Sequence, residues 1–87
     1  MPCVYVLRCA DGSLYTGAAK DLDRRVAQHL SGRASRYTRA RLPVTVVWSR
    51  DLRTWPAALR LEHRIKTLAR AEKDALVAGT LTLQRRR

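Results

Sequence analysis

The sequence predicts an α+β domain in which a three-stranded, mostly antiparallel sheet is flanked by helices, in the order β-β-α-β-α-α. An apolar run, a turn signal and a second run near the N-terminus indicate a hairpin, and "VTVVW" indicates a third strand. Helix caps and helical spacing of apolar residues mark the remaining segments. At 87 residues we expect one domain over 1–80, a basic tail over 81–87, and a shallow site.

The hairpin is predicted from residues 4–9 and 13–17, which are separated by the turn signal "ADG". The local sequence leaves the length of the loop open. A two-residue loop would place Tyr5 and Tyr15 on opposite faces of the sheet. A three-residue loop, with Gly12 in a left-handed conformation, would place both tyrosines on one face. The function considered below favours the second arrangement.

Each of the three predicted helices has a signal at one end or at both. The first follows Asp21, a good N-cap, and stops at Gly32. The second follows Thr54 and has a proline in its first turn. The third covers 72–78 and ends at Gly79. The apolar stripes expected to face the core are Leu22, Val26 and Leu30 in the first helix, and Ala58, Leu61, Ile65 and Leu68 in the second.

The charge of the chain indicates its class of partner. Eighteen Lys+Arg face 7 Asp+Glu, which gives a net charge of +11, and 15 of the cations are arginine. Arginine carries a planar fork of donors that matches phosphate oxygens, so the excess predicts nucleic acid. No stretch has the length of a membrane span, and no signal peptide is apparent. We therefore expect no membrane partner. Cys3 and Cys9 are too far apart along one strand for a disulfide, so we expect free thiols and a cytoplasmic protein.

Residues 32–41, "GRASRYTRAR", read as a basic polar loop with four arginines and no acid. Such a loop can supply phosphate anchors and one ring for stacking a base, although an ordinary solvated loop is the alternative. A lysine just before the first helix is a further candidate. The candidate nucleic-acid-binding residues are Lys20, Arg33, Arg36, Tyr37, Arg39 and Arg41.

Four segments in order resemble the GIY-YIG nuclease family. Cys3-Val4-Tyr5 stands where that family has Gly-Ile-Tyr, and Tyr15-Thr16-Gly17 stands where it has Tyr-Ile-Gly. "KDLDRRVAQH" is similar to the family helix with the essential arginine and a following histidine, and "LRLEHRIK" to the helix with the metal-binding glutamate. The resemblance covers about residues 3–78, and the small stand-alone bacterial members share "RYTR" and "RAEK". The asparagine that some members carry after the glutamate helix has no counterpart here.

The resemblance implies a metal-dependent endonuclease that hydrolyses phosphodiester bonds, of DNA rather than RNA. In it Tyr15 would be the general base, beside an arginine and the metal, and Tyr5 would orient water or phosphate. Arg25 would brace the phosphate with its bidentate fork, and His29 would protonate the leaving oxygen or hold phosphate. Glu62 would be the metal ligand for one Mg²⁺ or Mn²⁺, ions that take oxygen ligands and are often held by one or two carboxylates and substrate phosphate.

Structural alternatives exist for the same residues. Tyr5 and Tyr15 could be ordinary strand aromatics, and Glu62 could form a surface pair with Lys66 one turn away. The rival function is a catalytically weak or inactive nucleic-acid-binding module. A third possibility, a ribosome-associated structural protein, is supported only by size and charge.

Overall fold

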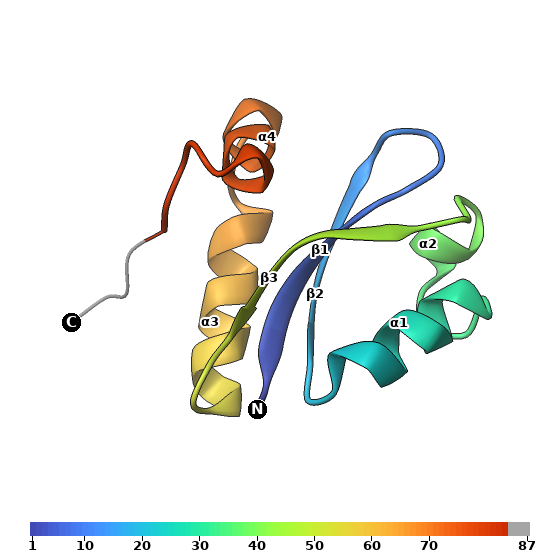
Figure 1. Ribbon diagram of the computed structural model, residues 1–87, viewed down its shortest axis with the longest axis horizontal. Coiled ribbons are helices and arrows are strands. Elements are labelled where there is room, and N and C mark those ends of the chain that lie inside the picture. Colours follow the sequence, from blue (N-terminus) through green and yellow to red (C-terminus); the bar gives the residue numbers. More distant parts are fainter. Residues whose placement is uncertain (84–87) are drawn as a thin grey trace.

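The computed structural model describes residues 1–83 and shows one sheet with helices on both sides (Figure 1). The strands are β1 (Cys3–Arg8), β2 (Leu14–Ala19) and β3 (Thr45–Asp51), in the order β2-β1-β3 and antiparallel at both pairings. The helices are α1 (Leu22–Leu30), α2 (Arg36–Arg39), α3 (Trp55–Lys66) and α4 (Arg70–Ala78). The predicted fold class and element order are confirmed, and α2 is an addition.

The first hairpin has the three-residue loop. Tyr5 pairs with Gly17 and Leu7 pairs with Tyr15, while Gly12 has a φ of 83°. Glycine adopts this left-handed conformation without strain. Because side chains alternate along a strand, this register places both tyrosines on the same face of the sheet. The second of the two arrangements left open by the sequence is therefore the one adopted.

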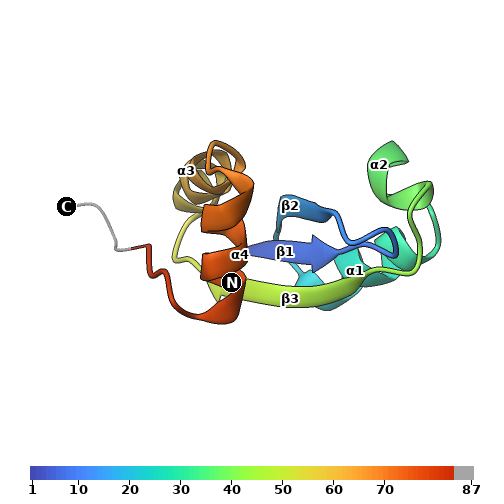
Figure 2. The same ribbon diagram turned by 90° about the horizontal axis from the view of Figure 1, so that it is seen from above.

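One face of the sheet packs on α3 and α4. Val4 and Val6 of β1 are buried in a cluster with residues of both helices. Figures 1 and 2 show α3 and α1 on opposite sides of the sheet. The apolar stripe predicted for the second helix is confirmed: Ala58, Leu61 and Ile65 are buried and Leu68 packs against them.

The other face of the sheet packs on α1 and α2, and here the predicted stripe of the first helix is wrong in part. Leu22 packs against the cluster under this face, but Leu30 is 49% exposed. The buried residue of α1 is His29, which is 0% exposed. A neutral imidazole can be buried at little cost when both ring nitrogens are hydrogen-bonded, and both are.

The segment 32–41, predicted as a loop, contains the short helix α2. The Ser35 side chain caps it by accepting a hydrogen bond from the Tyr37 backbone N–H at 3.1 Å. Four residues are too few to show a helical period of apolar residues, so the pattern could not reveal this helix.

The C-terminal end of the described chain packs on the sheet. Leu83 is buried with the α3–α4 cluster, although the sequence placed it in the tail, and its carbonyl accepts a hydrogen bond from Arg50 at 2.7 Å. The arginines at 85–87, assigned to the basic tail, lie outside the described residues. Cys3 and Cys9 are buried free thiols, as predicted. No helix within residues 1–83 is long and apolar enough to span a membrane.

Candidate active site

His29 is the centre of a buried hydrogen-bond chain between the sheet and α2. Its Nε2 lies 2.7 Å from the hydroxyl of Tyr5, and its Nδ1 lies 2.8 Å from the hydroxyl of Thr38. The Thr38 hydroxyl in turn lies 3.3 Å from the carbonyl oxygen of Ser35. Tyr5, His29 and Thr38 are at most 1% exposed, so the chain is shielded from water.

The direction of this chain follows from its last member. A carbonyl oxygen can only accept, so the single hydroxyl hydrogen of Thr38 is donated to Ser35. Thr38 must then accept from His29, which places the imidazole proton on Nδ1. The unprotonated Nε2 therefore accepts from Tyr5, whose hydroxyl proton points inward. The remaining lone pairs of the Tyr5 oxygen stay available as acceptors.

Gly17 lets the Tyr5 ring lie across the edge strand β2. The two residues face each other in the sheet register. A Cβ atom at position 17 would collide with the hydroxyl and ring of Tyr5. Glycine is required here by the close approach of an aromatic ring, since no turn or positive φ is involved.

Tyr15 lies beside the same imidazole but is only partly buried. Its ring meets His29 edge-on, with centroids 5.2 Å apart, and stacks on Tyr37 with centroids 6.0 Å apart and an interplanar angle of 25°. Within residues 1–83 no hydrogen bond engages the Tyr15 hydroxyl. Tyr15 is thus the phenol whose oxygen is open to a ligand, whereas the Tyr5 hydroxyl is committed to His29.

The charged candidates act electrostatically on Tyr5. Burial raises the pKa of Tyr5 well above its usual range, Tyr15 and the Glu62 carboxylate raise this pKa further, and Arg25 opposes the rise. Burial also lowers the pKa of His29, with a second contribution from Arg25. Arg25 belongs to α1 and Glu62 belongs to α3, so the Tyr5 hydroxyl is influenced by charges from two different helices.

Glu62 is the carboxylate that influences the Tyr5 hydroxyl electrostatically, and its surroundings fit a weakly held divalent ion. Its side chain is 20% exposed, and one oxygen lies 3.5 Å from the ammonium of Lys66, so the surface pair considered as an alternative exists. Within residues 1–83, no three His, Cys, Asp or Glu side chains group as metal ligands. Mg²⁺ is commonly held by one or two carboxylates together with substrate phosphate and water. Glu62 can supply the one carboxylate of such a donor set.

The basic candidates of the 32–41 segment divide into two groups. Arg41 is held within the protein: its guanidinium lies 3.8 Å from the Tyr37 ring centroid and 3.1 Å from a carboxylate oxygen of Asp11. One face of the Tyr37 ring is therefore covered by Arg41, while the ring also stacks on Tyr15. Three arginines of this segment are exposed and open to phosphate: Arg33, Arg36 and Arg39.

Lys20 lies apart from this segment. It is exposed at the end of β2, with its ammonium 5.5 Å from the ring centroid of Trp55.

Thr38 is a site residue that sequence reasoning missed. It is 0% exposed and fixes the imidazole through Nδ1. The available signal was Ser35, a good N-cap residue that indicates a helical turn in the following three residues. A turn at that point would have directed attention to Thr38 as an inward-facing position.

Comparisons with known proteins agree with this geometry. A family model described as the GIY-YIG catalytic domain matches residues 1–74. A UPF0213 protein of Natronomonas pharaonis is 49% identical over 75 residues, which cover 86% of this chain and 88% of that protein. A UPF0213 protein of Vibrio cholerae is 47% identical over 77 residues, which cover 87% of this chain and 76% of that protein.

A solved structure is similar as well. The solution NMR structure of a UPF0213 protein from Bacillus halodurans is 42% identical and has a TM-score of 0.59, covering 90% of this chain and 84% of that one. The family match, the relatives and the shared fold all agree with the four segments identified in the sequence. The chain therefore belongs to the GIY-YIG nuclease family.

Proposed function

We propose that this protein is a metal-dependent endonuclease that hydrolyses phosphodiester bonds of nucleic acid, with DNA as the favoured substrate. The observation that carries the proposal is the contact of two phenols with one imidazole, with two charged groups acting electrostatically on the buried phenol, so that five chemically suited side chains from four separate elements take part. These are Tyr5 from β1, Tyr15 from β2, Arg25 and His29 from α1, and Glu62 from α3.

Tyr15 is proposed as the general base. Its oxygen has no hydrogen-bond partner among residues 1–83 and is partly exposed, so it can reach the proton of an attacking water. Tyr5 is less suited to this role because its proton is given to His29 and burial raises its pKa. The free lone pairs of Tyr5 suit it instead to accept a hydrogen bond from that water and orient it.

Arg25 is proposed to brace the scissile phosphate, since a guanidinium fork matches two phosphate oxygens and stabilises charge that builds up in the transition state. Glu62 would hold the one Mg²⁺ or Mn²⁺ together with the substrate phosphate. When bound, such an ion supplies Lewis acidity toward a phosphate oxygen.

His29 is proposed to act through Tyr5. Both of its ring nitrogens are engaged and it is 0% exposed, which argues against direct contact with the leaving oxygen in this arrangement. By accepting the Tyr5 proton at Nε2, His29 fixes the direction in which the Tyr5 oxygen presents its lone pairs.

Nicking of supercoiled plasmid with Mn²⁺ tests the proposal, alongside single-stranded DNA, branched DNA and RNA as alternative substrates. We expect Glu62→Ala to lower cleavage by at least about 100-fold, because charge stabilisation by a metal is worth several kcal/mol. Glu72→Gln, at an exposed carboxylate in the first turn of α4, is the control and should cut normally. If wild type and Glu62→Ala are equally inert but both bind DNA with steep salt dependence, the protein is a binding module instead.

A further inference from the structure

A groove of about 790 Å³ lies beside α3. It is lined by four arginines, two near the end of β3 and two from one face of α3, and by a single carboxylate, Asp51. The four are Arg50, Arg53, Arg60 and Arg64.

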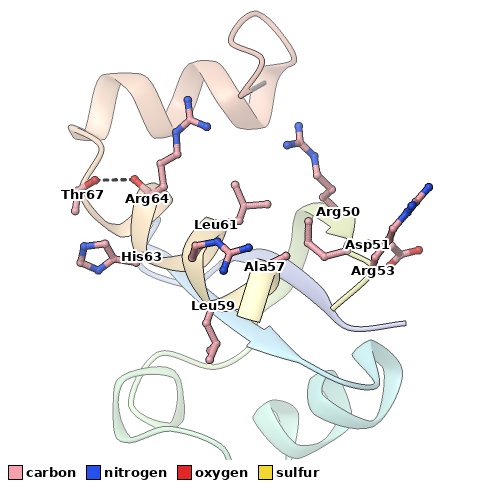
Figure 3. A pocket seen from close by; sticks show the side chains of 11 residues that line it. Arg50, Asp51, Arg53, Ala57, Leu59, Leu61, His63, Arg64 and Thr67 are labelled. Atoms are coloured by element: carbon pink, nitrogen blue, oxygen red, sulfur yellow. Dashed lines mark hydrogen bonds between the residues drawn. The ribbon is translucent and has the colours of Figure 1, made fainter. Parts of the chain in front are cut away.

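The groove lies on the other side of α3 from the catalytic cluster. Each helical residue rotates by about 100°, so Arg60 and Arg64 point roughly 200° away from Glu62. The floor of the groove includes apolar side chains, among them Leu61 and Leu52. Figure 3 shows the side chains of Arg50 and Arg64 on either side of Leu61.

Arg50 is held by contacts within the protein and Arg64 also has a partner, whereas Arg53 and Arg60 form no ion pair among residues 1–83. The Arg50 guanidinium donates to the Leu83 carbonyl at 2.7 Å and lies 5.3 Å from the Trp48 ring centroid, which fixes its position. Arg53 and Arg60 are exposed, and neither forms an ion pair with any carboxylate in residues 1–83. Exposed guanidinium groups around an apolar floor are suited to a ligand that carries both phosphate and a sugar or base.

We propose that this groove is a second nucleic-acid contact, which binds a phosphate and nucleotide of the substrate away from the bond that is cut. The inference rests on the proposed function in taking nucleic acid as the substrate. A helix with its side chains is about 10–12 Å across, and successive phosphates rise about 3.4 Å along a duplex strand. The groove therefore engages the substrate at least about three base steps from the catalytic cluster, and it contributes to affinity rather than to the chemical step.

Fluorescence anisotropy of a labelled 30-mer, single-stranded and duplex, without Mg²⁺ or Mn²⁺, tests this contact. The double variant Arg53→Gln/Arg60→Gln should weaken binding about 10-fold at 150 mM salt and reduce the slope of log affinity against log salt by about 2. The control Arg8→Gln/Arg24→Gln removes the same charge from two exposed arginines outside the groove and should change affinity less than about 3-fold. Circular dichroism of both variants verifies that they fold.

In cleavage assays the groove variant should raise KM about 10-fold and leave kcat unchanged. Equal effects of the groove and control variants on the affinity for the 30-mer would overturn the inference. That result is expected if the groove binds an acidic protein instead of nucleic acid. If wild type does not cut but the groove variant loses binding as stated, the proposed function fails and the groove contact stands.

Discussion

The two faces of β1 place neighbouring side chains in opposite environments. Val4 and Val6 enter an apolar cluster beneath α3 and α4, where burial and dispersion hold the layers together. Tyr5, between them in sequence, enters a polar chain with His29 and Thr38 on the other face. In residues 1–83 every fully buried side-chain nitrogen and oxygen has a partner. Both faces therefore bury apolar side chains, but only the second also holds reactive groups in one orientation.

The difference predicts how each face responds to change. On the apolar face a truncated side chain leaves a cavity, and the free energy of unfolding falls with the volume lost. On the polar face a substitution that preserves volume can still remove a donor or acceptor and leave a buried partner unsatisfied.

Ile65→Ala should give the largest loss of stability. Ile65 is 0% exposed at the centre of the α3 contact with the sheet, so we expect a loss of about 2–5 kcal/mol in urea denaturation. Leu59→Ala on the same helix is the matched control, because Leu59 is 42% exposed and should cost less than about 0.5 kcal/mol. Similar losses for both variants would mean that this face of α3 is not a packed core.

Thr38→Val should cost less, about 1–3 kcal/mol, although it keeps the shape of the side chain. The valine leaves one nitrogen of His29 without a partner. Thr38→Ser keeps the hydroxyl and should recover most of the loss. ¹⁵N NMR of the imidazole gives a direct readout: wild type should carry its proton on Nδ1, and a proton on Nε2 would contradict the hydrogen-bond direction derived above.

The smallest effect expected is a dependence of stability on mildly acid pH. Burial lowers the pKa of His29 in the folded protein, so below about pH 6.5 the unfolded chain binds a proton that the folded chain does not. Stability should therefore fall as pH decreases from about 6.5 toward the lowered pKa, with a slope of at most about 1.4 kcal/mol per pH unit.

His29→Gln removes this titration, because a glutamine can still donate and accept hydrogen bonds but does not ionise in this range. Urea denaturation at a series of pH values compares the two proteins. An unchanged pH dependence in His29→Gln would assign the effect to other groups.

The same two faces show what could be predicted from sequence. The apolar stripe of α3 is predicted correctly, because Ala58, Leu61 and Ile65 recur at helical spacing and all three are buried. The polar face was read only in part. Leu30 continues an apolar pattern yet is 49% exposed, and the imidazole of His29 takes the buried position because it finds two hydroxyl partners. One of these partners, Thr38, comes from a short turn with no periodic signal.

The register of the hairpin, like the burial of His29, is decided by contacts between distant parts of the chain. Turn residues alone allowed two loop lengths, and the choice depends on contacts that form only in the folded protein. The Tyr5 ring fits across β2 only when Gly17 is opposite to it. Local propensity therefore predicts elements and caps, while the position of the site depends on long-range packing.

Tyr15→Phe tests the central claim, that Tyr15 acts in a hydrolytic site with Arg25 of α1 and Glu62 of α3, most directly. The Tyr15 hydroxyl has no hydrogen-bond partner within residues 1–83, so its removal should leave the urea midpoint unchanged. Loss of a general base should lower the rate of plasmid nicking with Mn²⁺ by about 10²–10⁴-fold. A Tyr15→Phe protein that nicks plasmid at the wild-type rate would contradict the account.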